Sequence, residues 1–94
     1  MPIDGRLDLH GMTQDAAHRA LVSFLGEAQG AAKRCVIVIT GKGLGADGSV
    51  GVLREAVPRW LNEPELRGRI LTFSHAQPKD GGTGALYVLL RRLK

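Results

Sequence analysis

An aspartate and a histidine stand two residues apart in the segment LDLHG, Leu7 to Gly11. In an extended chain successive side chains alternate between faces, so Asp8 and His10 point to one side and the leucines to the other. At roughly 3.3 Å per residue their backbones lie about 6.6 Å apart, a span that a carboxylate and an imidazole can bridge. A histidine held by a carboxylate is suited to general acid–base chemistry. The pair is therefore either the capped end of a strand or the start of a catalytic site.

A lysine between two glycines, in the segment TGKG (Thr40 to Gly43), is the second candidate for chemistry. Lys42 can bring a cation, and its glycine neighbours free backbone N–H groups, up to a phosphate without a side chain in the way. The alternative is that the glycines only supply turn geometry. A third glycine-rich stretch, GGTGA, ends at Ala85.

Nucleotide and metal sites are both disfavoured. The segment GLGADG (Gly43 to Gly48) matches G-x-G-x-x-G, but no acidic residue ends the next predicted strand and no second mononucleotide-binding half follows. Lys42 is also not followed by the Ser or Thr of a phosphate-binding P-loop. The three histidines and one cysteine are too scattered for a known metal site, so His18 and His75 are interpreted as surface or partly buried histidines.

The hydrophobic pattern predicts the elements that position these residues. After the first strand, Thr13 caps a helix that ends at Gly30. The run CVIVIT, residues 35–40, lacks polar alternation and is typical of a central strand buried on both faces. Ser49 can cap a second helix, which Pro58 should kink or from which it should split off a final turn.

Two further strands, at residues 70–76 and 85–93, are expected to pair antiparallel. The order is then βαβαββ, a two-layer α/β domain with a four-stranded mixed sheet. The loops after parallel strands share one edge of such a sheet, and the last strand begins on that edge if it runs antiparallel to the others. The three candidate stretches should therefore converge. Arg91, Arg92 and Lys94 form either a solvated tail or an electrostatic track that extends this edge.

Composition limits the classes of protein. The chain has 94 residues, of which 44% are hydrophobic, enough for one ordered domain. Thirteen Lys and Arg against nine Asp and Glu give a net charge of +4, which favours a polyanionic partner without excluding a merely basic surface. The single Cys35 is expected to be a buried thiol of a reducing compartment. The lack of an apolar leader or a membrane-length run favours a cytoplasmic protein with no membrane partner. Because the first strand begins almost at once, the chain is compatible with a domain of a longer protein.

Three motifs together, LDLHG, TGKG and GGTGALYVLLRR, resemble the small MutS-related (Smr) domain family. The resemblance covers residues 7–92 of a single domain spanning 1–94. It implies a βαβαββ fold similar to the C-terminal domain of the bacterial translation initiation factor that keeps ribosomal subunits apart. It also implies a nucleic-acid binder, since several members are endonucleases that nick DNA or cleave RNA, including messenger RNA on stalled ribosomes.

By position, the resemblance places Asp8 and His10 at the catalytic site. The residues expected to bind the substrate are Thr40, Gly41, Lys42, Gly43, Gly81, Gly82, Gly84, Ala85, Arg91 and Arg92. Many relatives have histidine where this chain has Thr40, which puts in question any mechanism that needs a second histidine there.

Three functions remain open. In a nuclease, His10 acts as general base or acid, Asp8 orients it and favours its protonated form, and Lys42 with loop N–H groups stabilises charge on the phosphate. RNA cleavage of this kind needs no cofactor, whereas DNA cleavage needs water or a divalent metal ion. The alternatives are a nucleic-acid-binding module without turnover and a protein-interaction domain. The ribosome is a further partner that the resemblance allows.

Overall fold

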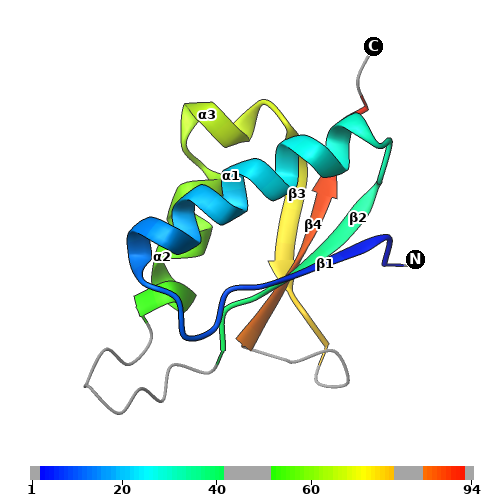
Figure 1. Ribbon diagram of the computed structural model, residues 1–94. Coiled ribbons are helices and arrows are strands. Elements are labelled where there is room, and N and C mark those ends of the chain that lie inside the picture. Colours follow the sequence, from blue (N-terminus) through cyan, green and yellow to red (C-terminus); the bar gives the residue numbers. More distant parts are fainter. Residues whose placement is uncertain (1–2, 42–51, 78–83, 93–94) are drawn as a thin grey trace.

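The computed structural model describes residues 3–41, 52–77 and 84–92 of the chain. The strands are β1 (Gly5–Asp8), β2 (Cys35–Ile39), β3 (Ile70–His75) and β4 (Ala85–Leu90). The helices are α1 (Gln14–Gly30), α2 (Val52–Leu61) and α3 (Pro64–Arg67). Their order along the chain and in space is shown in Figure 1. No helix in these described stretches is long and apolar enough to cross a membrane.

The strands form one mixed sheet in the order β1-β2-β4-β3. β1 and β2 are parallel, and β4 runs antiparallel to both of its neighbours. The ends of β1, β2 and β3 and the start of β4 therefore meet at one edge, which we call the site edge. The starts of β1, β2 and β3 and the end of β4 meet at the opposite edge. The predicted α/β architecture with a four-stranded mixed sheet is confirmed.

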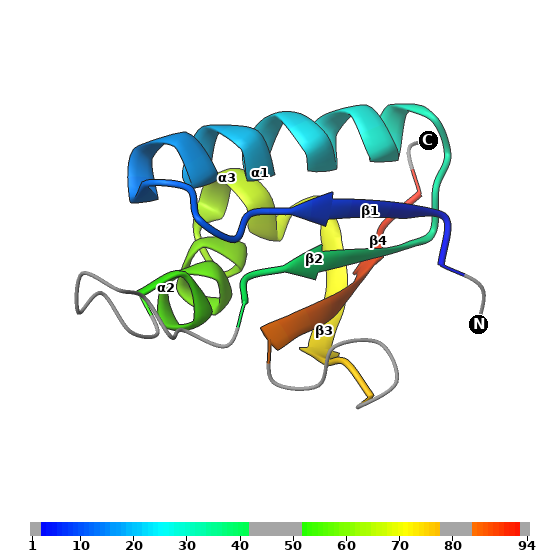
Figure 2. The same cartoon turned by 60° about the horizontal axis from the view of Figure 1, so that its bottom comes forward.

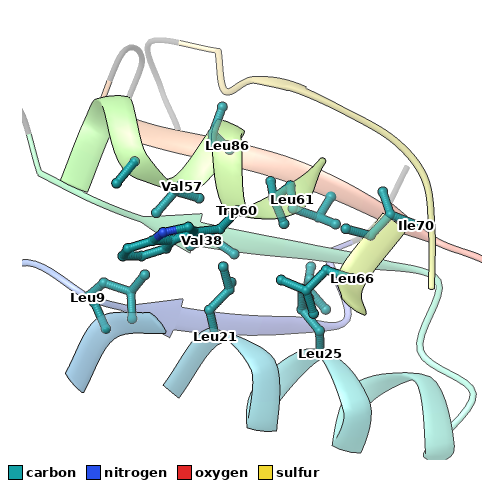
Figure 3. Close-up of a cluster of buried hydrophobic side chains, with 14 of the residues drawn as sticks. Leu9, Leu21, Leu25, Val38, Val57, Trp60, Leu61, Leu66, Ile70 and Leu86 are labelled. Atoms are coloured by element: carbon teal, nitrogen blue, oxygen red, sulfur yellow. The ribbon is translucent and has the colours of Figure 1, made fainter. Parts of the chain in front are cut away.

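All three helices pack on one face of the sheet (Figures 1 and 2). Along each strand, side chains that point toward the helices alternate with side chains that point to the other face of the sheet. The core that joins the two layers contains Leu9, Leu21, Leu25, Val38, Val57, Trp60, Leu61, Leu66, Ile70 and Leu86 (Figure 3). Four of the five residues of β2 are buried, as expected for the strand with a neighbour on each side. The core thus holds β1 and β2, the strands that carry the site, in a fixed register.

Helix α1 begins and ends for identifiable local reasons. Thr13 caps it, since its side-chain oxygen accepts a hydrogen bond from the backbone N–H of Ala16 at 3.2 Å. The last helical residue is Gly30, as predicted. The left-handed residue that stops the helix is nevertheless Ala32, with φ of 61°. The N–H of Ala32 bonds to the carbonyl of Gln29 and that of Lys33 to the carbonyl of Ala28, which is a Schellman motif.

Other element boundaries differ modestly from those predicted. Thr40 lies outside β2, and β4 ends at Leu90 rather than at residue 93. Helix α2 continues to Leu61, one turn past Pro58, and the separate turn α3 begins at Pro64 instead. Proline is tolerated at that first helical position because its missing N–H has no partner there. The expected cap at Ser49 lies outside the described residues.

Candidate active site at the edge of the sheet

His10 lies at the exposed corner of a tight turn that follows β1. The N–H of Met12 bonds to the carbonyl of Leu9 at 3.1 Å, and Gly11 has φ of +80°. A positive φ at the third residue alone is typical of a type II turn, which glycine adopts without steric cost. Leu9 anchors the turn because it is fully buried and its N–H bonds to the carbonyl of Ile39. His10 is therefore displayed from a rigid support.

Asp8 holds His10 through a single carboxylate oxygen. Its Oδ1 accepts the backbone N–H of His10 at 3.0 Å and lies 2.8 Å from Nδ1 of the imidazole. The first contact fixes the turn, and the second fixes the ring when Nδ1 carries the proton. Both interpretations of the Asp8–His10 pair, a capped strand end and an oriented histidine, are thus compatible with the same geometry.

The two hydrogen bonds also set the charge state of Asp8. They stabilise the carboxylate, the imidazole contact more than the backbone N–H, and hold the pKa of Asp8 below its usual range. Asp8 is therefore ionised at neutral pH, and the stability it contributes is lost only as the pH falls through that lowered value. The side chains of His10 and Asp8 are 70% and 41% exposed, and so exposed a pair adds at most about 1 kcal/mol to stability. So small a contribution to stability does not by itself explain why the Asp8–His10 pair is there.

The carbonyl of Gly84 joins the end of β2 to the start of β4. It accepts the N–H of Thr40 at 2.8 Å, the N–H of Gly41 at 3.1 Å and the hydroxyl of Thr40 at 3.3 Å. The Thr40 hydroxyl is also 3.1 Å from the carbonyl of Gly41, and Thr40 is buried. These N–H groups are therefore already used within the protein and are not free for a phosphate. These hydrogen bonds hold Thr40 and Gly41, at the end of β2, against the start of β4.

Gly41 lies directly against the turn that carries His10. It has φ of +81°, and a Cβ atom built on it would lie 3.3 Å from Cβ of His10. The sequence predicted a glycine loop near the site but gave no sign of this contact, because it depends on how the two loops are spaced at the sheet edge.

Replacing Gly41 by alanine should lower the cleavage rate by more than the accompanying loss of stability would explain. The left-handed backbone costs about 1–2 kcal/mol, and the new methyl group displaces His10 by a few tenths of an ångström. Misplacing a catalytic group by about 1 Å can cost 10²-fold, so we expect about tenfold slower cleavage of nucleic acid. Gly11→Ala is the matched control, because its φ is nearly the same but, apart from its two chain neighbours, no described residue lies within 4 Å of its built Cβ. Equal cleavage rates for the two variants at equal stability would contradict a positioning role.

The remaining predicted site residues divide into three groups. Lys42, Gly43, Gly81 and Gly82 lie outside the described residues. Ala85 is buried in the sheet beside Ile37. Arg91 and Arg92 follow β4 and lie at the opposite edge, because β4 begins at the site edge and runs away from it. The expectation that these arginines extend the site edge is therefore wrong about their location.

The other titratable side chains play separate parts. His18 lies 3.1 Å from Glu63 through Nε2 and packs edge-on against Trp60, so it joins α1 to the end of α2. His75 is exposed at the end of β3. Burial raises the pKa of Cys35, as expected for a core thiol. Within the parts of the chain that are described, no three His, Cys, Asp or Glu side chains are grouped to hold a metal ion.

Comparison with known proteins gives a consistent family assignment. The family model described as Smr domain matches residues 7–91. The probable DNA endonuclease SmrA of Escherichia coli is 31% identical over 97% of this chain, and the ribosome rescue factor SmrB of Photobacterium profundum is 34% identical over 93%. The chain spans 47% and 44% of the lengths of these relatives. The crystal structure of the Smr domain of Thermus thermophilus MutS2 superposes with a TM-score of 0.77 at 30% identity, covering 93% of this chain and 98% of that one.

Proposed function

The chain belongs to the Smr domain family, and we propose that it is an endonuclease domain that cleaves RNA or nicks DNA through Asp8 and His10. The observation that carries this proposal is the presentation of the His10 ring. Asp8 engages Nδ1, while Nε2 has no hydrogen-bond partner among the described residues, and the side chain is 70% exposed. An imidazole fixed at one nitrogen and open at the other is prepared to exchange a proton with a bound substrate.

On RNA the reaction needs only groups that the substrate and the imidazole supply. Nε2 takes the proton of a 2′-hydroxyl, whose oxygen then attacks the adjacent phosphorus. The bond to the 5′-oxygen breaks, and that oxygen leaves with a proton returned by the imidazolium or by water. The products are a cyclic 2′,3′-phosphate and a 5′-hydroxyl. Asp8 stabilises the imidazolium formed on the way, because it is an ionised carboxylate 2.8 Å from Nδ1.

On DNA the 2′-hydroxyl is missing, so water must attack the phosphorus. A divalent metal ion brought with the substrate is then the natural source of an activated water. Lys42 is the residue that we propose for balancing charge on the phosphate in both cases, on the strength of its place in the TGKG motif.

A nucleic-acid-binding module without turnover is the second candidate. One specific observation favours it: the position that holds Thr40 is filled by a buried hydroxyl that bonds to backbone carbonyls, so it supplies no second acid or base. In this case the site edge holds RNA or DNA and delivers another domain or the ribosome to it. The SmrB relative is a ribosome rescue factor, which suggests the ribosome as a partner.

Incubation with labelled single-stranded RNA and DNA, with and without a chelator, tests these proposals. We expect RNA products with cyclic phosphate ends, formed equally well with and without the chelator. Any nicking of DNA should stop when the chelator is present. Salt-dependent binding without products from either polymer would favour the binding module. Absence of both binding and cleavage would contradict both proposals and leave the protein-interaction domain.

A further inference from the structure

Basic side chains gather at the opposite edge of the sheet, far from His10. They come from three separate segments, which the strand order brings together. These residues, which we call the basic edge, are Lys33, Arg34, Arg67, Arg69, Arg91 and Arg92. Two backbone hydrogen bonds join the segments: the N–H of Leu90 bonds to the carbonyl of Arg34, and the N–H of Arg91 to that of Arg69, both at 2.8 Å.

The positive charge of the basic edge is largely unbalanced. The ion pairs found in the described part of the chain involve His10 and His18, and neither includes a residue of the basic edge. Hydrogen bonds from the N–H groups of Arg34 and Cys35 lower the pKa of Asp4, and the nearby charges of Lys33 and Arg34 lower it further. Asp4 therefore faces Lys33 and Arg34, two of the six cations of the basic edge. Such a surface attracts polyanions over a distance of about 10 Å at 0.1 M salt.

Two of these arginines are held in place by the core. Gln29 is 95% buried, and its Oε1 accepts a hydrogen bond from Nη1 of Arg69 at 2.8 Å while its Nε2 donates to the carbonyl of Arg91 at 2.9 Å. Nε of Arg91 in turn donates to the carbonyl of Ile70 at 3.2 Å. Each guanidinium uses one of its five N–H groups in this way. The remaining donors are presented at little further entropic cost, which favours phosphate binding.

A hollow of about 220 Å³ lies between Arg67 and Arg91. Its other walls include Leu71, Thr72 and Phe73, and Leu71 is 57% exposed. A hollow lined by both arginines and by the apolar side chains of Leu71 and Phe73 suits a nucleobase lying between two phosphates. A flat anionic surface such as a membrane would leave the hollow unfilled, so the shape favours nucleic acid.

We propose that the basic edge is a second nucleic-acid contact, which binds the phosphate backbone of the strand that is cleaved at the site edge. This inference rests on the proposed function. The six residues of β4 separate the two edges by about 20 Å at roughly 3.3 Å per residue. A strand of many nucleotides can reach both edges, whereas a trinucleotide can occupy only one. The basic edge therefore adds affinity for long substrates without taking part in the chemistry.

The double variant Arg67→Gln/Arg92→Gln tests the proposal without disturbing the fold. Both side chains are exposed and make no hydrogen bond within the described residues, in contrast to Arg69 and Arg91. Arg19→Gln/Arg59→Gln removes the same charge from exposed positions of α1 and α2 and is the matched control. Binding to an uncleavable 2′-O-methyl RNA of about 20 nucleotides is measured by fluorescence anisotropy at several salt concentrations, and cleavage is measured on unmodified RNA.

We expect the R67Q/R92Q variant to bind the long RNA at least about tenfold more weakly at 0.1 M salt. The slope of log affinity against log salt should fall by about 1.4, since each lost phosphate contact on a single strand removes about 0.7. Cleavage of a trinucleotide should match that of the wild type.

The controls separate this inference from the proposed function. If the wild type binds and cleaves RNA but both double variants lose affinity equally, the basic edge is no specific contact while the proposed function stands. If only binding to phosphatidylserine vesicles falls, the basic edge is a membrane contact and the inference is wrong. If the wild type shows no salt-dependent RNA binding, the proposed function fails and the inference fails with it.

Discussion

Replacing His10 by alanine is expected to lower the rate of RNA cleavage by about 10²–10⁴-fold, the usual contribution of a positioned acid–base group. No other imidazole can take over, because His18 is engaged with Glu63 and Trp60 and His75 lies at the end of β3, three strands along the sheet. Stability should change by no more than about 1 kcal/mol, since the His10 side chain is 70% exposed and Leu9 anchors the turn. Binding to an uncleavable RNA should largely survive.

His75→Ala is the matched control for this experiment. It removes an exposed histidine from the same edge of the sheet without touching Asp8 or its turn. Cleavage and binding are measured for both variants after circular dichroism has confirmed that they fold. A wild-type rate for His10→Ala, or an equal loss for His75→Ala, would contradict the assignment of His10 as the catalytic residue.

The placement of Asp8 and His10 could be predicted because it depends on local rules. Alternation along an extended chain puts Leu7 and Leu9 on the core side and the polar pair outside, and the structure agrees. The apolar run of β2 indicated a central strand for the same reason. Antiparallel pairing of β4 then brought Gly84 to the site edge, where it meets Thr40.

The features that the sequence did not predict depend on packing between distant segments. The pairing that brings Gly84 to the site edge also places Arg91 at the opposite edge. The two residues belong to one continuous motif, GGTGALYVLLRR, so the sequence gives no sign that they lie at opposite ends of a strand. The occupation of the Thr40 and Gly41 amides by one carbonyl requires the spacing of two loops to be known. Gln29 reads as an ordinary polar residue of a helix, and only the fold shows that it is buried beneath two arginines.

Asp8→Asn is the second variant from which we expect a large effect. Asparagine is nearly the same size as aspartate and keeps one side-chain oxygen. That oxygen can accept the backbone N–H of His10, which in the wild type bonds to Oδ1 of Asp8 at 3.0 Å. The turn and the fold should therefore survive. The negative charge beside Nδ1 is lost, so the imidazolium formed during cleavage loses its ionised partner.

The asparagine amide can also change which nitrogen of the His10 ring carries the proton. If its NH₂ group turns toward Nδ1, that nitrogen must accept a hydrogen bond, and the ring proton moves to Nε2. Nε2 is the atom that the proposed mechanism needs as a base. The lost negative charge and the shift of the ring proton to Nε2 both lower the cleavage rate. We therefore expect cleavage to fall by about 10²-fold, the lower end of the contribution of an acid–base group.

Two measurements distinguish this role of Asp8 from that of a simple turn residue. Cleavage rates are compared with those of Asp15→Asn, which removes an exposed carboxylate from the first turn of α1; within the described residues the His10 side chain bonds to Asp8 and not to Asp15. The ¹⁵N chemical shifts of the His10 ring report which nitrogen carries the proton. We expect Asp8→Asn to change both the rate and the shifts, and Asp15→Asn to change neither. If Asp8→Asn cleaves RNA as fast as Asp15→Asn and leaves the ring nitrogens unchanged, Asp8 serves only to cap the strand, and His10 acts without a positioning partner.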